Sequence, residues 1–119
     1  MESYKVVRPE HLNHFGYLFG VFTLMWVDEI SWIAASRDYP GCSFVTVSMD
    51  KVEFRRGVHQ GAVLRFDVRK RHAGNTSVEY EVQVYADDLE TGTEEAIFQT
   101  HIRFVCLDAM GKKTLLPRR

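Results

Sequence analysis

The segment from Phe19 to Arg37 constrains the fold most, because it is long, apolar and has no polar face. It runs "FGVFTLMWVDEISWIAASR" and is followed by Pro40 and Gly41, which end it. At about 100° per residue in a helix, the acids Asp28 and Glu29 have apolar neighbours on both sides. The segment therefore predicts one long helix, buried nearly all round, inside a sheet that wraps it.

Alternating apolar and charged residues predict the strands of that sheet. In residues 63–72 and 77–86, apolar side chains take every second position and polar side chains take the others. This period of two is typical of antiparallel strands with one face in water. Further strand candidates are residues 4–7, 44–54 and 96–108. The predicted order is a strand, the long helix and then four strands.

The composition is that of one globular α+β domain over residues 1–119, with 45% hydrophobic and 26% charged residues. A net charge of −1, with both signs scattered, gives no electrostatic case for nucleic acid. The start has no apolar core typical of a signal peptide, and two acids break the long apolar run, so we expect no membrane span. Cys42 and Cys106 lack a C-x-x-C spacing, and we expect two reduced thiols in a cytoplasmic protein.

Asp28 is the main candidate for a catalytic residue. A short carboxylate among apolar side chains is costly unless it is paired or has a chemical role. For Glu29, contact with solvent or a salt bridge at a subunit interface is the simpler explanation. His11 and His14 have H-x-x-H spacing, but no third ligand accompanies them, so we expect no metal.

The segment "VVRPEHLNHFGYLFGVFTLMWVDE" resembles the beginning of the hotdog-fold acyl-CoA thioesterases. That family has an Asp- or His-x-Asn loop, F-G-G or H-G-G at the helix start, and an acid further along the helix. Here these elements are His11-Leu12-Asn13, Phe19-Gly20-Val21 and Asp28. The segments "VTVSMDKVEFRRGVHQGAVLRF", "AGNTSVEYEVQVYADDLETG" and "FVCLDAMGKKTLLP" resemble the later strands, so the resemblance covers nearly the whole chain. Val21 stands where a second Gly is usual, and Gly57 where a Pro is usual.

The resemblance implies a hotdog fold, in which a five- to six-stranded antiparallel sheet wraps a long central helix. It also implies hydrolysis of acyl-CoA to the free acid and coenzyme A. Asp28 would be the general base, or the nucleophile through a mixed anhydride. The helix-start amides of Gly20 and Val21 would form the oxyanion site, and Asn13 would hold the water or the carbonyl.

The spacing of these residues predicts a homodimer. Asp28 lies eight residues beyond Gly20, which corresponds to roughly 12 Å at about 1.5 Å per residue. One water cannot span that gap, so the acid should meet the oxyanion amides of another subunit. Sites of the family lie between paired protomers, and its dimers often pair again into tetramers or hexamers.

Coenzyme A would be part of the substrate, so no separate cofactor is expected. Its phosphates need cationic side chains or backbone N–H donors. The phosphate candidates are Arg55, Arg56 and Arg71, with Thr76 and Ser77 beside a predicted hairpin turn. For Arg71 the alternating charge of any solvated sheet face is an equally good explanation.

Two other functions remain open at this stage. Hydroxyacyl thioester dehydratases of the same fold carry H-F-P-G and an acid fourteen residues after the His, which His14-Phe15-Gly16 and Asp28 resemble. The Pro of that motif is missing, and Asn13 fits the thioesterase loop. The chain could also be a non-catalytic acyl-CoA-binding sensor, although such sensors usually carry a DNA-binding segment, which we do not expect here.

Overall fold

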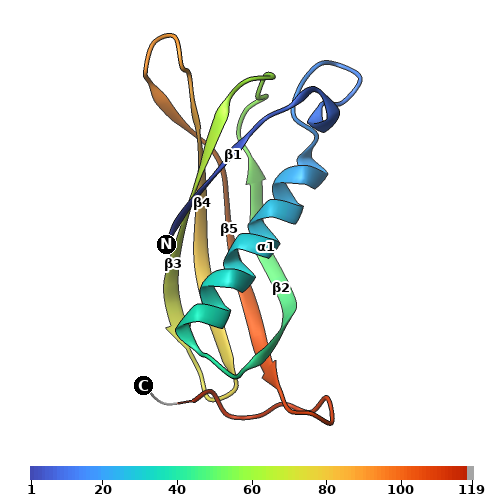
Figure 1. Cartoon of the computed structure of the whole chain (residues 1–119), viewed down its shortest axis with the longest axis vertical. Coiled ribbons are helices and arrows are strands. Elements are labelled where there is room, and N and C mark those ends of the chain that lie inside the picture. Colours follow the sequence, from blue (N-terminus) through green and yellow to red (C-terminus); the bar gives the residue numbers. More distant parts are fainter. Residues whose placement is uncertain (118–119) are drawn as a thin grey trace.

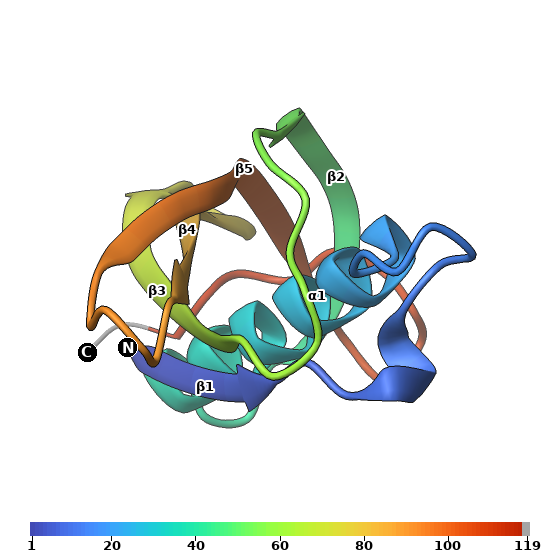
Figure 2. The same ribbon diagram turned by 90° about the horizontal axis from the view of Figure 1, so that it is seen from above.

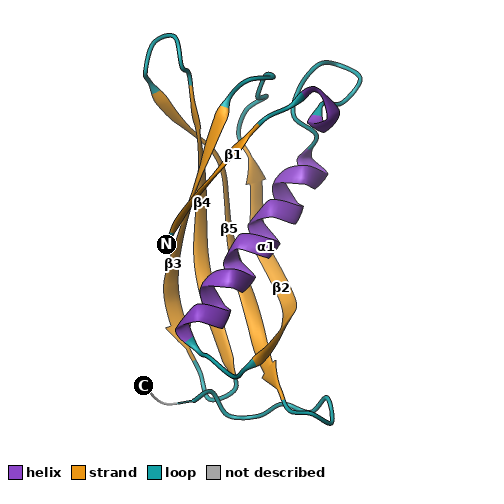
Figure 3. Cartoon of the chain, in the orientation of Figure 1, coloured by secondary structure: helices purple, strands orange, loops and turns teal. Residues whose placement is uncertain are grey.

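The computed structural model describes residues 1–117, which form one long helix and a five-stranded antiparallel sheet (Figure 1). The predicted order of a strand, a helix and four strands is confirmed (Figure 3). A short 3₁₀ helix, Pro9–His11, lies between the first strand and the long helix. The elements are β1 (Glu2–Val6), α1 (Gly20–Asp38), β2 (Ser43–Phe54), β3 (Val63–Ala73), β4 (Ser77–Asp87) and β5 (Glu94–Leu107).

The sheet has the strand order β1-β3-β4-β5-β2, and every neighbouring pair is antiparallel. Viewed from above, it curves around one side of α1 (Figure 2). β2 is an edge strand whose register against β5 shifts twice, and Lys51 within it has a φ of 52°. Such irregularities bend and twist an edge strand.

The core lies between α1 and the concave face of the sheet. The period-two prediction is confirmed there, because alternate residues of β3 and β4 are buried. The helix adds Trp26, Val27, Ile30, Ala34 and Ala35 from one face. The buried residues of β3 and β4 are Leu64, Phe66, Val68, Val78, Tyr80, Val82 and Val84.

The expectation that α1 is buried nearly all round is wrong for the single chain. Val21, Met25 and Trp32 keep 57%, 52% and 44% of their surface exposed. The physical reason is that the sheet is a single layer, which covers only one side of the helix (Figure 2). Asp28 is half-buried, and Glu29 is exposed.

The expectation of two reduced cysteines is also wrong, because Cys42 and Cys106 form a disulfide. Their Cα atoms are 5.4 Å apart, although they are separated by 64 positions in the sequence. Pairing of β2 with β5 brings them together, since Phe44 lies opposite Cys106 in the ladder. The bridge thereby ties the segment that follows α1 to β5.

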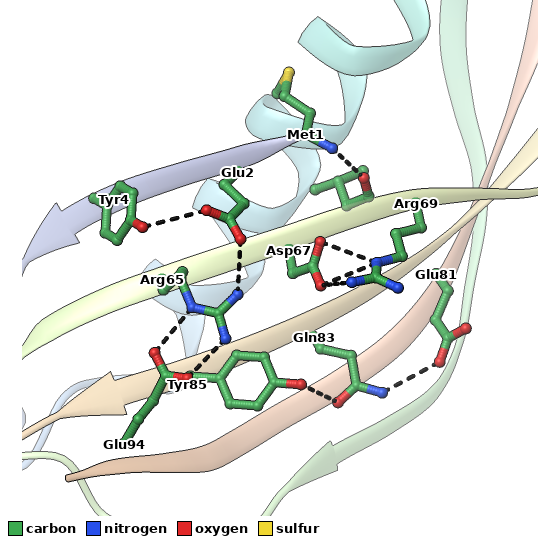
Figure 4. Close-up of polar contacts among 11 residues, drawn as sticks. Met1, Glu2, Tyr4, Arg65, Asp67, Arg69, Glu81, Gln83, Tyr85 and Glu94 are labelled. Carbon is green, nitrogen blue, oxygen red and sulfur yellow. Dashed lines mark hydrogen bonds and ion pairs between the residues drawn. The ribbon is translucent and has the colours of Figure 1, made fainter.

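The outer face of the sheet carries a network of charged and polar side chains (Figure 4). Arg65 donates to both carboxylate oxygens of Glu94, at 2.9 and 2.7 Å, and to Glu2 at 3.1 Å. Its guanidinium carbon lies 4.3 Å from the ring centroid of Tyr85. The hydrogen bonds from Arg65 hold the pKa of Glu94 below its usual value. The network connects β1, β3, β4 and β5 on the sheet face that the alternating sequence pattern predicts to be solvent-exposed.

Within residues 1–117, no helix is long and apolar enough to cross a membrane.

Candidate active site

A cleft of about 780 Å³ opens at the start of α1. The loop before the helix, the first turn of α1 and the segment after β2 contribute to it. Asn13, Gly20, Arg55 and Arg56, all predicted site residues, line it together. The other lining residues are Tyr17, Leu18, Thr23, Phe54, Gly57, Val58, His59, Ile97 and Phe98.

Asn13 organises the loop that leads into α1. Its Oδ1 accepts hydrogen bonds from the amides of Phe15 at 2.9 Å and Tyr17 at 3.2 Å. Gly16 has a φ of 85°, which a tight turn of this kind requires from glycine. Because the loop uses the side-chain oxygen, the NH₂ group of Asn13 is the part left to donate into the cleft.

The helix start opens into the same cleft. Phe19 is the N-cap and makes no side-chain capping bond, so within the described chain no side chain satisfies the first amides of α1. These amides carry the positive end of the helix dipole. A Cβ atom on Gly20 would lie 3.1 Å from the ring of Phe54, so a larger residue there would require that ring to shift by a few tenths of an ångström.

Gly57, in the β2–β3 loop where a Pro is usual in the family, also has a local explanation. A Cβ atom on Gly57 would lie 2.7 Å from the ring of Tyr17. Tyr17 also packs against His59, with ring centroids 4.8 Å apart. The aromatic ring of Tyr17 thus occupies the space that a larger residue at position 57 would need.

Asp28 lies further along α1 and does not line the cleft of the single chain. Its Oδ1 accepts a 2.6 Å hydrogen bond from the hydroxyl of Thr46 on β2. The prediction from sequence missed Thr46. Its only signal was a hydroxyl among valines in "FVTVS", and the sequence does not reveal which helix residue that strand position faces.

The proposed phosphate contacts do not gather in one place. Arg55 and Arg56 line the cleft. Arg55 donates a hydrogen bond to Gln99 at 2.9 Å, and Arg56 pairs with Glu95. Arg71 lies on the outer face of the sheet, where it bonds Glu79 at 2.6 Å. Thr76 lies in the β3–β4 turn and Ser77 is the first residue of β4, at the end of the sheet opposite the helix start (Figure 1).

The two histidines that suggested a metal or a dehydratase have other surroundings. His11 accepts a hydrogen bond from the Arg8 amide through Nδ1 at 3.0 Å and packs edge-on against Trp26. His14 is exposed, stacks on Phe15 with centroids 4.0 Å apart, and does not line the cleft. Over the described range 1–117, no three His, Cys, Asp or Glu residues are grouped to hold a metal ion.

Comparison with known proteins identifies the family. Residues 15–93 match the model of the Thioesterase superfamily, so the chain belongs to that family. An acyl-CoA hydrolase from Staphylococcus aureus, solved with butyryl coenzyme A, coenzyme A and coenzyme A disulfide, is 30% identical, with a TM-score of 0.89. That match covers 98% of this chain and 71% of the other. A hexameric acyl-CoA thioesterase is also 30% identical, with a TM-score of 0.91 over 98% of this chain and 74% of the other. The predicted hotdog fold is thereby confirmed.

Among curated relatives, the uncharacterized acyl-CoA thioester hydrolase YkhA of Bacillus subtilis is 32% identical over 94% of this chain. Mouse acyl-coenzyme A thioesterase 11 is 31% identical over 93% of it. The chain spans 64% of the length of the first relative and 18% of the second. Structures of the S. aureus hydrolase include variants in which an asparagine, an aspartate or a threonine is replaced by alanine.

Proposed function

We propose that this chain hydrolyses acyl-CoA thioesters to free acids and coenzyme A. The observation that carries the proposal is the uncapped start of α1, which opens into a cleft beside the Asn13 side chain. Such a site offers hydrogen-bond donors to the charge that develops on a thioester oxygen under attack. Membership of the Thioesterase superfamily supports the same chemistry.

In the proposed reaction, the thioester oxygen faces the amides of Gly20 and Val21. Asn13 donates its NH₂ group to the carbonyl or to the attacking water. Asp28, acting as general base, takes a proton from that water as its oxygen bonds to the carbonyl carbon. The carbon–sulfur bond then breaks, and the proton passes to the departing thiolate. In the alternative route the Asp28 carboxylate attacks first, and water hydrolyses the resulting anhydride.

We propose a homodimer as the active unit. Asp28 and Gly20 are roughly 12 Å apart along one helix, so the reacting groups must come from two chains. The outer edge of β2 pairs with no strand of residues 1–117, and the neighbouring face of α1 exposes Val21, Met25 and Trp32. A second copy would cover both features. Hexameric structural neighbours support assembly beyond the dimer.

The S. aureus variants support the choice of residues. The asparagine and the aspartate replaced in that enzyme are 15 positions apart, as Asn13 and Asp28 are here. The third residue replaced there is a threonine 17 positions beyond the aspartate, whereas Thr46, which contacts Asp28, is 18 positions beyond it in this chain. The shared spacing of the asparagine and the aspartate supports Asp28 as the catalytic acid, in addition to its position on α1.

For coenzyme A, we propose Arg55 and Arg56 as phosphate contacts at the cleft. Arg71, Thr76 and Ser77 would reach a nucleotide only from another subunit, because they lie away from the cleft of their own chain. A relative from rat is named a cytosolic acyl coenzyme A thioester hydrolase and is 27% identical, which supports a cytoplasmic location.

The test is thiol release from acyl-CoAs of different length by the wild type and by Asp28→Asn. We expect Asp28→Asn to lower kcat at least about 100-fold, the usual loss for a general base, while light scattering shows an unchanged oligomer. Glu29→Gln removes the adjacent exposed carboxylate and is the matched control. Absence of thiol release by the wild type from every acyl-CoA would contradict the proposal.

His14→Ala separates hydrolysis from dehydration. His14 is exposed and lies outside the cleft, so we expect this variant to keep most thiol release. A dehydratase that uses His14 and Asp28 would instead lose its activity, which absorbance of the enoyl thioester product measures.

A further inference from the structure

We propose that Thr23 is a specificity residue, whose hydroxyl binds a hydroxyl or oxo group on the acyl part of the substrate. This inference rests on the proposed thioester hydrolysis and narrows its substrate class to acyl groups that carry such a group near the thioester.

The Thr23 side chain combines burial with an unused hydroxyl. It is 2% exposed and lines the cleft at the start of α1. Among residues 1–117, no group forms a hydrogen bond with its hydroxyl, and the hydroxyl is not one of the fully buried oxygens without a partner, which are those of Ser31 and Ser36. The hydroxyl is therefore left to face the cleft. A ligand that displaces water from it must replace the hydrogen bond or leave the hydroxyl without a partner, which costs free energy.

The position of Thr23 on α1 places it along the path of the acyl chain. It is three residues beyond Gly20, so it lies on the same side of the helix and about 4.5 Å further along its axis. With the thioester oxygen at the Gly20 amide, the first acyl carbons lie beside Thr23. A polar atom two or three bonds from the carbonyl carbon would be within hydrogen-bond distance of the hydroxyl.

The surroundings of Thr23 make this hydroxyl selective. Leu18, Ile97 and Phe98 line the same cleft with apolar side chains. An unsubstituted acyl chain would contact them well but would leave the Thr23 hydroxyl without a partner. A site that presents a buried hydrogen-bonding group discriminates against a ligand that cannot use it.

Two serines of α1 provide a comparison. The hydroxyls of Ser31 and Ser36 are fully buried and have no partner in the described chain, and neither residue lines the cleft. Ser31→Ala therefore removes a similar hydroxyl from the same helix without changing the cleft surface.

The experiment compares 3-hydroxybutyryl-CoA with butyryl-CoA, which differ by one hydroxyl. We expect the wild type to favour the hydroxylated ester about tenfold in kcat/KM, the contribution of one good hydrogen bond. Thr23→Val has nearly the same shape without the hydroxyl and should bring this ratio close to one. Thr23→Ser and Ser31→Ala should keep the wild-type ratio, and thermal unfolding checks that each variant is folded.

An unchanged ratio in Thr23→Val would overturn the inference. Equal losses on both esters would also overturn it, because the hydroxyl would then serve the thioester group that both share. If the wild type cleaves neither ester, the proposed hydrolysis fails, and binding of S-butyl-CoA and S-(3-hydroxybutyl)-CoA by calorimetry decides the inference separately. A preference for the hydroxylated thioether that Thr23→Val abolishes would support it, and equal wild-type affinities would refute it.

Discussion

The hydroxyl of Thr46 donates a 2.6 Å hydrogen bond to Asp28 Oδ1 and connects β2 to α1 at the proposed catalytic carboxylate. A carboxylate side chain on a helix face can rotate, and this bond fixes one oxygen toward the strand. The second oxygen is then the one left to face the substrate, which in the proposed dimer is held by the other subunit.

Removal of the Thr46 hydroxyl should therefore affect turnover more than binding. We expect Thr46→Val to lower kcat about tenfold, since the bond is charge-assisted, with little change in KM. Thr46→Ser keeps the donor and should keep most of kcat. Steady-state kinetics of the three proteins provide the measurement, and a rise in KM alone would contradict a positioning role.

Gly20→Ala tests the contact between the helix start and Phe54. The new methyl group would lie 3.1 Å from the Phe54 ring, closer than ordinary contact. We expect a clear loss of kcat/KM, because the ring or the first turn of α1 must move. Phe54→Leu removes the ring edge, so the double variant should recover part of that loss. Full activity in Gly20→Ala would show that the ring yields without disturbing the amides.

The Cys42–Cys106 disulfide makes a prediction about stability. It closes a loop of 64 positions, for which the chain-entropy relation gives about 4 kcal/mol at 25 °C as an upper value. Dithiothreitol or the Cys42→Ala/Cys106→Ala pair should lower the free energy of unfolding in urea by up to that amount. A thiol reagent that finds two reactive cysteines in the non-reduced native protein would contradict the bridge.

Much of the fold follows from local patterns in the sequence. The alternation at Leu64, Phe66 and Val68 predicted a buried strand face, and the apolar segment 19–37 lies within one residue of the observed helix, Gly20–Asp38. Asn13 and Gly20 were found by resemblance, because they are close in sequence and belong to one loop–helix unit. The structure brings both to the cleft together with Arg55 and Arg56.

What the sequence did not predict depends on register between distant elements. The disulfide requires Phe44 to lie opposite Cys106, and the role of Thr46 requires β2 to face Asp28. Neither relationship leaves a periodic signal. The exposed face of α1 was missed for a different reason: an apolar sequence does not reveal whether its own sheet or a second chain covers it.

Tyr80 provides the prediction that depends on pH. Its side chain is 1% exposed, and its hydroxyl donates to Asp38 Oδ2 at 2.6 Å. Burial, followed by the hydrogen bond to Asp38, raises the pKa of Tyr80 well above its usual value of 10.0. In the folded protein the phenol keeps its proton where an unfolded tyrosine loses it. The unfolded chain then binds fewer protons, so stability should fall as the pH rises above about 10.

Tyr80→Phe should remove this contribution to the alkaline loss of stability. At pH 7 we expect the variant to be less stable by about 1–2 kcal/mol, because a buried hydrogen bond to a partly exposed carboxylate is lost. Urea unfolding at several pH values between 7 and 11 gives both the free energy of unfolding at pH 7 and its decrease with rising pH. Tyr85→Phe is the control, since that hydroxyl contacts Gln83 at 3.3 Å on the outer sheet face; this change should shift stability by no more than about 0.5 kcal/mol. An alkaline slope that is identical in Tyr80→Phe and the wild type would show that the Tyr80 phenol ionises equally in the folded and unfolded chains.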